Sequence, residues 1–161
     1  VPESDVVPWY LDCKYPNYGK KLLPSEPKTL ARMKIMMKII GPTIGNLYGL
    51  LKNQDASKDD DMIDSIHSKL KKIMSLADEN GPYLLGNEIS YVDIMLMPFY
   101  DRFRNLLPHY RNRELFPSGD ARWQKWADAV TSRESFKKTS QPKEFLIDAY
   151  ASYAGARGKS K

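Results

Sequence analysis

Apolar residues recur at steps of three and four along much of the chain, which is the spacing of one face of a helix. Within residues 27–53 they are Leu30, Met33, Met37, Ile40, Ile44, Leu47 and Leu51. Within residues 59–79 they are Ile63, Ile66, Leu70, Ile73 and Ala77. The pattern predicts two long amphipathic helices. Pro27 suits the start of the first, and Gly41-Pro42 predicts that this helix bends or breaks.

Residues 91–107 differ, because apolar side chains surround almost the whole circumference of the predicted helix. A helix of this kind is typical of the centre of a bundle. Pro98 predicts a kink in it. Ser90 and Asp93 have the spacing of a capping box, in which the Ser90 hydroxyl and the Asp93 carboxylate satisfy the first N–H groups of the helix. The box would therefore begin the most buried helix of the protein.

Shorter helices are expected over residues 5–13, 120–131, 134–138 and 142–154. Ser4 is a candidate N-cap for the first, and Gly155 a C-cap for the last. Nothing after residue 20 has the pattern of a strand, so we expect an all-α fold.

Three prolines, Pro16, Pro24 and Pro27, mark residues 14–27 as the best linker in the chain. The predicted units are residues 1–24, an all-helical domain over 25–156, and a basic, frayed tail over 157–161 that should be dispensable for stability.

Composition narrows the function further. The 161 residues fit one domain, with 25 basic and 20 acidic residues and a formal net charge of +5. Residues 133–161 hold seven of the basic residues against three acidic ones, so the surplus lies at the C-terminal end. A solvated terminus explains it more simply than nucleic-acid binding does.

No apolar run reaches the roughly 18 residues of a membrane span. We therefore expect neither a nucleic-acid nor a membrane partner. One cysteine and two histidines argue against a metal site.

Four segments together resemble the cytosolic glutathione transferases. Residues 81–86 (GPYLLG) and 89–94 (ISYVDI) are similar to the capping-box segment of that family. Residues 10–16 (YLDCKYP) and 20–24 (KKLLP) are similar to the end of its first domain and the linker. The stretch from Trp123 to Tyr153 resembles the closing helices of the omega class, and the trypanosomatid thiol-dependent reductases, also called glutathione thioltransferases, are similar as well.

The resemblance implies a fold and a reaction. The chain would be the helical C-terminal domain of a glutathione transferase or thioltransferase with the last helix of its thioredoxin-like domain. The rest of that domain would be the missing partner, and glutathione the co-substrate. The catalytic cysteine of omega-like members begins the first helix of that domain, so no catalytic residue is expected in this chain, which alone should be inactive. Cys13 comes late in a helix, where the dipole does not favour a thiolate, and is expected to be a small structural hydrophobe.

The resemblance also implies binding residues. Glu3 and Ser4 match the pair that holds the γ-glutamyl end of glutathione; the alternative is a plain helix cap. The small electrophile or disulfide substrate would lie against Met36, Met37, Tyr48, Met95 and Tyr100. From the residues alone, an ordinary core is the favoured interpretation of these five positions.

Two classes of function remain open. The first is part of a glutathione-dependent enzyme, expected in the cytoplasm, as a homodimer or a tandem repeat. The second is a non-catalytic interaction module, because transferase-like helical domains also hold partners in translation factors. A cysteine that begins the first helix of the thioredoxin-like domain would favour the enzyme, and Glu3-Ser4 favours it too.

Overall fold

Helices form the regular structure of residues 2–116 and 119–158, the part of the chain that the computed structural model describes. In chain order they are α1 (Val6–Lys14), α2 (Pro27–Lys52), η1 (Ala56–Lys58), α3 (Asp59–Ser75), α4 (Tyr91–Arg111), α5 (Ala121–Thr131), α6 (Glu134–Thr139), α7 (Lys143–Ala154) and η2 (Gly155–Gly158). Within these residues the β-type pairing is an isolated bridge between Tyr83 and Gly86. The all-α prediction is confirmed. None of the described helices is both long enough and apolar enough to cross a membrane.

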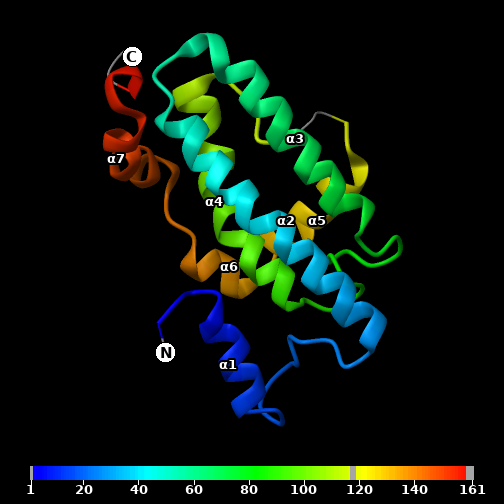
Figure 1. The fold of residues 1–161 in the computed structure, drawn as a ribbon. Coiled ribbons are helices and arrows are strands. Elements are labelled where there is room, and N and C mark those ends of the chain that lie inside the picture. The colour runs from blue at the N-terminus through cyan, green and yellow to red at the C-terminus, as the bar shows by residue number, and fades with distance from the viewer. Residues whose placement is uncertain (1, 117–118, 159–161) are drawn as a thin grey trace.

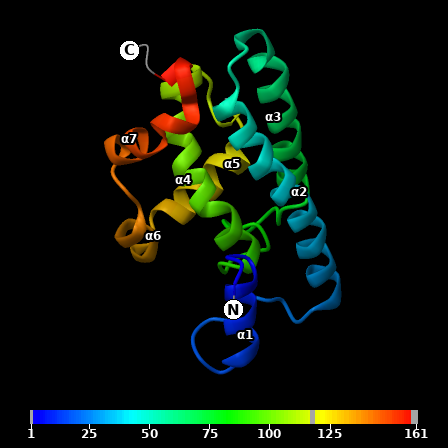
Figure 2. The same cartoon turned by 60° about the vertical axis from the view of Figure 1, so that its left-hand side comes forward.

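Helix α4 lies at the centre of the bundle (Figure 1). Helix α2 packs along one side of it and α7 on another, and α3 packs along α2. Figure 2 shows α5 beside α4 and α1 beyond the lower end of the bundle, far from the C-terminus. The side chains with almost no exposed surface include Met33, Met36, Ile40, Leu50, Ile66, Ile73, Leu84, Phe103, Leu106 and Trp126. The predicted central position of residues 91–107 is thus confirmed.

The long helices continue through their internal prolines. Helix α2 runs through Pro42 as one helix, so of the two outcomes expected there, a bend or a break, the break does not occur. Helix α4 contains both Pro98 and Pro108 and ends at Arg111, four residues beyond the expected end. Both helices are packed against neighbours, and this tertiary packing outweighs the missing N–H groups.

The capping box of α4 is formed, and the Asp93 carboxylate also accepts hydrogen bonds from residues outside the box. Its Oδ2 atom accepts from the Ser90 N–H at 2.8 Å and from the Ser90 hydroxyl at 2.5 Å. Its Oδ1 atom accepts from the Leu84 N–H at 2.9 Å and from the Trp126 indole N–H at 2.8 Å. Burial raises the pKa of the fully buried Asp93 carboxyl, and the four donors act in the opposite direction. The carboxylate therefore joins α4, α5 and the loop before α4.

The loop before α4 is held by a tight glycine turn within it and by an arginine side chain of α5. A Cβ on Gly81 would lie 2.0 Å from the carbonyl carbon of Gly86, and Gly86 has φ +140°, so this turn requires glycine at both positions. The Arg122 guanidinium on α5 donates to the carbonyls of Asp78 at 3.0 Å and Tyr83 at 2.8 Å. The loop before α4 thus adds to the Asp93–Trp126 bond in fixing α5 to α4.

At the opposite end of α4, a buried arginine joins the ends of several helices. Arg111, at the end of α4, donates to the carbonyls of Leu50 (3.0 Å), Leu51 and Ala154 (3.2 Å). These carbonyls lie at the C-terminal ends of α2 and α7, where the regular helical hydrogen bonds end, and the Leu50 carbonyl also accepts the N–H of the C-cap residue Asn53 at 3.2 Å. Burial lowers the pKa of Arg111. The C-terminal ends of three helices therefore meet at one cation, which the sequence did not indicate.

The prediction of a frayed tail over residues 157–161 is wrong at Arg157. Its guanidinium donates to both carboxylate oxygens of the buried Asp59, at 3.0 and 2.5 Å, and to the Asn53 carbonyl at 3.1 Å. Burial alone would raise the pKa of Asp59, but the hydrogen bonds from Arg157 and Asn53 hold it below its usual value. The residues 159–161 of the predicted tail lie outside the described part of the chain.

The Asp93 bonds predict an order of stability losses. Asp93→Asn should lower the free energy of unfolding by about 3 kcal/mol, because an amide nitrogen would face groups that are themselves donors. Ser90→Ala should cost about 1–2 kcal/mol, and a double-mutant cycle of the two changes should show coupling. The exposed control Asp148→Asn should cost less than about 0.5 kcal/mol. Urea denaturation measures all of these, and equal losses for Asp93→Asn and the control would contradict the role of Asp93.

The Asp59–Arg157 pair predicts a pH-dependent stability. Because the pKa of Asp59 is lower in the folded state, its contribution is present above the unfolded-state pKa and is lost as the pH falls through the folded-state value. Arg157→Met should therefore cost about 2 kcal/mol at pH 7, and the difference from the unmodified protein should shrink below about pH 4.

Arg113→Met provides the matched control. Arg113 pairs with Asp60, whose side chain is 77% exposed, and such pairs contribute about 0–1 kcal/mol. Equal losses in the two variants at pH 7, or a loss at Arg157 that is independent of pH, would show that Arg157 does not stabilise the fold through Asp59.

Candidate functional site

Helix α1 is anchored to the beginning of α4. The Trp9 and Tyr91 rings meet edge to face, with 5.6 Å between centroids. The Tyr91 hydroxyl donates to the Asp5 carbonyl at 2.6 Å. The Asp12 carboxylate accepts the N–H groups of Leu22 and Leu23 at 2.7 and 3.2 Å, which ties the linker to α1. These contacts fix the N-terminal end of α1 relative to the bundle.

Glu3 precedes α1 with φ +72°, a conformation that residues other than glycine rarely adopt. Its carbonyl accepts the N–H groups of Val6 and Val7 at 3.1 and 3.2 Å. The N-cap is Asp5, whose side chain makes no capping bond, so the expectation that Ser4 caps the helix is wrong. Glu3 and Ser4 are both exposed. Backbone strain of this kind is found at functional sites, and the first turn of α1 adds a partial positive charge beside it.

Cys13 is exposed, one residue before the C-terminal end of α1. Its expected packing as a small hydrophobe is therefore wrong. The partial charge at a helix C-terminus is negative and does not favour a thiolate. Among the described residues, no three side chains of the histidine, cysteine or carboxylate type are grouped so that they could hold a metal ion.

Tyr48 lies in an aromatic cluster that joins α2, α4 and α7. Its ring meets Phe103 edge to face at 5.0 Å and Phe99 at 6.4 Å, and stacks on Tyr150 at 6.3 Å. The two hydroxyls of Tyr48 and Tyr150 are 3.5 Å apart. Burial, followed by the bond with Tyr150, raises the pKa of Tyr48 to about 12. Tyr48 is thus a neutral donor at neutral pH, at the edge of an apolar surface.

Tyr100 belongs to a different cluster. Its ring stacks on Phe116 at 5.3 Å and meets Trp126 edge to face at 5.3 Å. Together with Trp123 it lines a cavity of about 660 Å³ between α4 and α5. Tyr48 and Tyr100 therefore do not line the same pocket.

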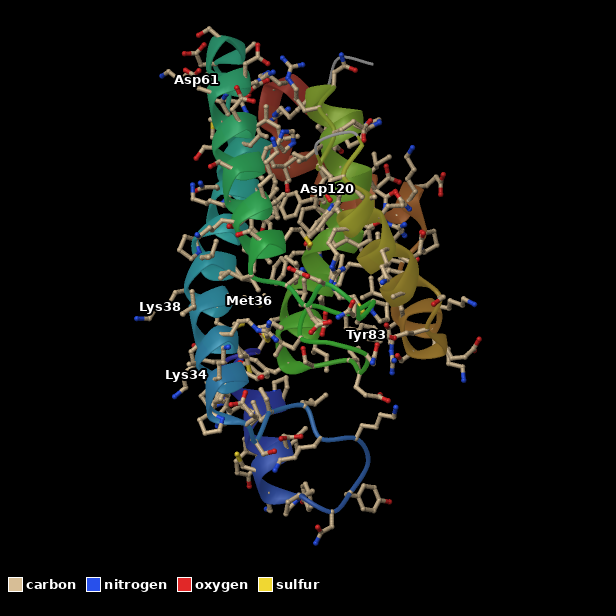
Figure 3. All side chains as sticks on the ribbon, turned by 90° about the vertical axis from the view of Figure 1, so that its right-hand side faces the viewer. Lys34, Met36, Lys38, Asp61, Tyr83 and Asp120 are labelled. Carbon is tan, nitrogen blue, oxygen red and sulfur yellow. The ribbon has the colours of Figure 1, made fainter. Side chains whose placement is uncertain are left out.

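The three methionines of the predicted pocket are less accessible. Met36 has no exposed surface, Met95 is 8% exposed, and Met37 is half-buried against the core. Figure 3 shows Met36 on the inner side of α2, whereas Lys34 and Lys38 project outward. Met36 could contact a ligand only if its neighbours moved.

Arg102 is the residue at this site that the sequence analysis missed. Its guanidinium lies 5.3 Å from the Phe99 ring centroid and near the Tyr48 hydroxyl. It also lines a smaller cavity of about 240 Å³ with Met97, Phe136, Gln141 and Leu146. No sequence signal marked it, because a single arginine on a helix is normally a surface residue.

Comparisons with known proteins identify the family to which this fold belongs. The glutathione S-transferase C-terminal domain family matches residues 31–139. The glutathione S-transferase-like protein OpS6 of Beauveria bassiana is 28% identical over 89% of the chain and 68% of its own length. Glutathione S-transferase DHAR2 of Arabidopsis thaliana is 28% identical over 97% of the chain and 68% of its own length. The chain spans only 52% of a chloroplastic relative from the same plant, glutathione S-transferase DHAR3.

Solved structures have the same fold. Glutathione transferase Omega 3C from Trametes versicolor superposes with a TM-score of 0.80 at 24% identity, over 99% of this chain and 67% of its own. Leishmania TDR1, a trimeric glutathione transferase, superposes with a TM-score of 0.78 at 21% identity, over 99% of this chain and 34% of its own.

The fold and the anchored α1 define the helical domain of a glutathione transferase. The chain belongs to the glutathione S-transferase C-terminal domain family and is related to its omega, dehydroascorbate reductase and lambda members.

The strained backbone at Glu3 predicts an unusual response to glycine. Glu3→Gly should be more stable than Glu3→Ala by about 1 kcal/mol, because only glycine adopts a positive φ at no steric cost. Hydrogen exchange of the α1 amides measures the difference. At the adjacent Ser4, which lacks a positive φ, glycine should instead be equal to or less stable than alanine. Equal protection in Glu3→Gly and Glu3→Ala would contradict the strain.

Proposed function

We propose that this chain is the helical part of a glutathione-dependent thiol transferase, in which a thioredoxin-like unit packed on α1 supplies the reactive cysteine. The observation that carries the proposal is the exposed Glu3-Ser4 pair, held in a strained backbone at the start of α1. The relationship to omega and dehydroascorbate reductase proteins supports the same reaction class.

The exposed side of α1 is suited to such a unit. Val6, Tyr10 and Leu11 are 43%, 39% and 47% exposed on a helix of nine residues. Trp9 on the same helix packs against the body. A helix with apolar side chains on both sides is typical of an element between two packed layers. The second layer would bury these three side chains.

Glu3 and Ser4 would hold the γ-glutamyl end of glutathione. The Glu3 carboxylate is matched to the γ-glutamyl ammonium group through a charge-assisted hydrogen bond. The Ser4 hydroxyl and the first N–H groups of α1 are matched to the carboxylate beside it. The cysteinyl end would need backbone groups of the thioredoxin-like unit, so this chain alone should hold only part of the tripeptide.

The co-substrate would lie against the Tyr48 cluster rather than against all five residues expected from the sequence. Tyr48 offers a neutral hydroxyl, Phe99 and Tyr150 offer apolar rings, and Arg102 offers a positive charge. Such a surface fits a substrate with an apolar body and an anionic group, as a glutathionylated thiol has. Tyr100 and the buried Met36 would act through packing.

The reaction would proceed in two balanced exchanges. The thiolate of the thioredoxin-like unit attacks the glutathionyl sulfur of the substrate disulfide, and the substrate leaves as a thiolate. A second glutathione thiolate then attacks the mixed disulfide, which releases glutathione disulfide and restores the cysteine. This chain would orient the two molecules and would contribute no group to the exchange.

The alternative, a non-catalytic interaction module, shares the fold but needs neither Glu3 nor the aromatic surface. Binding of glutathione therefore separates the two functions. In a protein that joins this chain to its thioredoxin-like unit, Glu3→Gln should weaken glutathione binding ten- to a hundredfold, because a charge-assisted contact of about 1.5–3 kcal/mol is lost. Isothermal titration calorimetry measures the change.

Two controls complete the experiment. Glu79→Gln removes one exposed carboxylate elsewhere and should leave the affinity unchanged. The chain by itself should bind glutathione only weakly and should not catalyse thiol transfer. Micromolar binding by the chain alone that disappears in Cys13→Ser would contradict the proposal, and so would an unchanged affinity in Glu3→Gln.

A further inference from the structure

A groove between α2 and α3 is lined by lysines and contains no carboxylate. It has a volume of about 640 Å³. We call it the lysine groove, and its lining consists of Lys38, Ile39, Pro42, Ser68, Lys69, Lys71, Lys72 and Ser75. It lies on a different part of the surface from Glu3 and from the Tyr48 cluster, so the proposed reaction does not use it.

The acidic residues of α3, Asp59, Asp60, Asp61 and Asp64, lie in its first half, whereas the α3 lysines of the groove lie in its second half. Residues 27–54 contain five basic side chains and no acidic one, and residues 65–77 contain three and none. None of the ion pairs found in the described residues involves a lysine of the groove. Lys69 donates to neutral groups, the Ser65 hydroxyl at 2.8 Å and the Asn46 side-chain oxygen at 3.0 Å. Such a concentration of one charge in a concave surface attracts anionic partners.

Helix stability accounts for only part of this charge. Lys71 and Lys72 lie in the last turns of α3, where cations complement the helix dipole. Lys38 lies in the middle of α2, where the dipole has no effect, and Figure 3 shows Lys34 and Lys38 projecting away from the bundle. These α2 lysines therefore contribute nothing evident to folding.

An apolar row accompanies the lysines. Ile35 is 50% exposed and lies one helical turn before Ile39, which is followed by Pro42. A partner with apolar side chains between carboxylates would bury this row and pair with the lysines at its edges. Apolar anchors within a charged rim are the usual form of a peptide-binding surface.

Nucleic acid fits the lysine groove less well. Its lining contains no arginine and no aromatic side chain. Arginine forks bind phosphates in two-point geometry, and aromatic rings stack on single-stranded bases. Lysines around an isoleucine and a proline offer charge and an apolar floor, but neither of these features.

We propose that the lysine groove binds an acidic segment of a partner protein whose apolar side chains lie on Ile35 and Ile39. The partner segment contacts both α2 and α3 and leaves the Glu3 site free. It is independent of the proposed transferase reaction, because none of its residues belongs to that site.

The test uses the full chain and a short fluorescein-labelled peptide of alternating glutamate and leucine, followed by fluorescence anisotropy. The charge reversal Lys38→Glu/Lys72→Glu should weaken binding at least tenfold, and added salt should weaken binding to the unmodified chain. The matched control Lys138→Glu/Lys143→Glu changes the net charge equally at exposed positions of α6 and α7 and should have little effect. Ile35→Ser should weaken binding of this peptide but not of a peptide of glutamate alone.

Three outcomes would overturn the proposal. Equal losses in the two double variants would mean that the peptide responds only to net charge. Tighter binding of single-stranded RNA or of phosphatidylserine vesicles, with the same dependence on Lys38 and Lys72, would assign the groove to another partner. Self-association in sedimentation velocity that is lost in Lys38→Glu/Lys72→Glu would assign it to a second copy of this chain. Circular dichroism should show unchanged folding, since these side chains are exposed or lie at the edge of the groove.

Discussion

The carboxylate of Asp93 is the point at which three separate parts of this chain are joined. It is buried, yet each oxygen accepts two hydrogen bonds, and these offset part of the cost of removing the charge from water. The donors come from the cap of α4, from the loop before it and from α5. Because α1 is anchored to the first residue of α4, the same carboxylate also determines where Glu3 lies.

The basic side chains of this protein have different roles according to where they lie in the fold. Arg111 and Arg157 are used inside the fold, where they bind helix-end carbonyls and the buried Asp59. The lysines of α2 and α3 are left at the surface, and within residues 2–116 and 119–158 no carboxylate forms an ion pair with them. These basic side chains thus form two groups: internal arginines that stabilise the C-terminal end of the bundle, and surface lysines that remain available to a partner.

The two aromatic clusters explain how one helix can serve a core and a ligand surface. Phe99 and Tyr100 are neighbours on α4, and neighbours on a helix point in directions about 100° apart. Phe99 therefore meets Tyr48 and the side of α7, whereas Tyr100 meets Trp126 and α5. Apolar residues around the whole circumference of α4 make both contacts possible, and the proposed substrate surface is only one of them.

The sequence determined the helices and the capping box, because each depends on residues that are close along the chain. It placed the elements α2, α3 and α4 and the pair Ser90–Asp93 correctly. It could not show that Trp126 and Leu84 complete the Asp93 site, that Arg157 is docked, or that Tyr48 and Tyr100 are separated. It also placed Ser4 at a cap and Cys13 in a packed position, both wrongly. These features depend on which faces of distant helices meet. A helical period gives the side on which a residue lies but not the element that it contacts, so only the tertiary structure decided them.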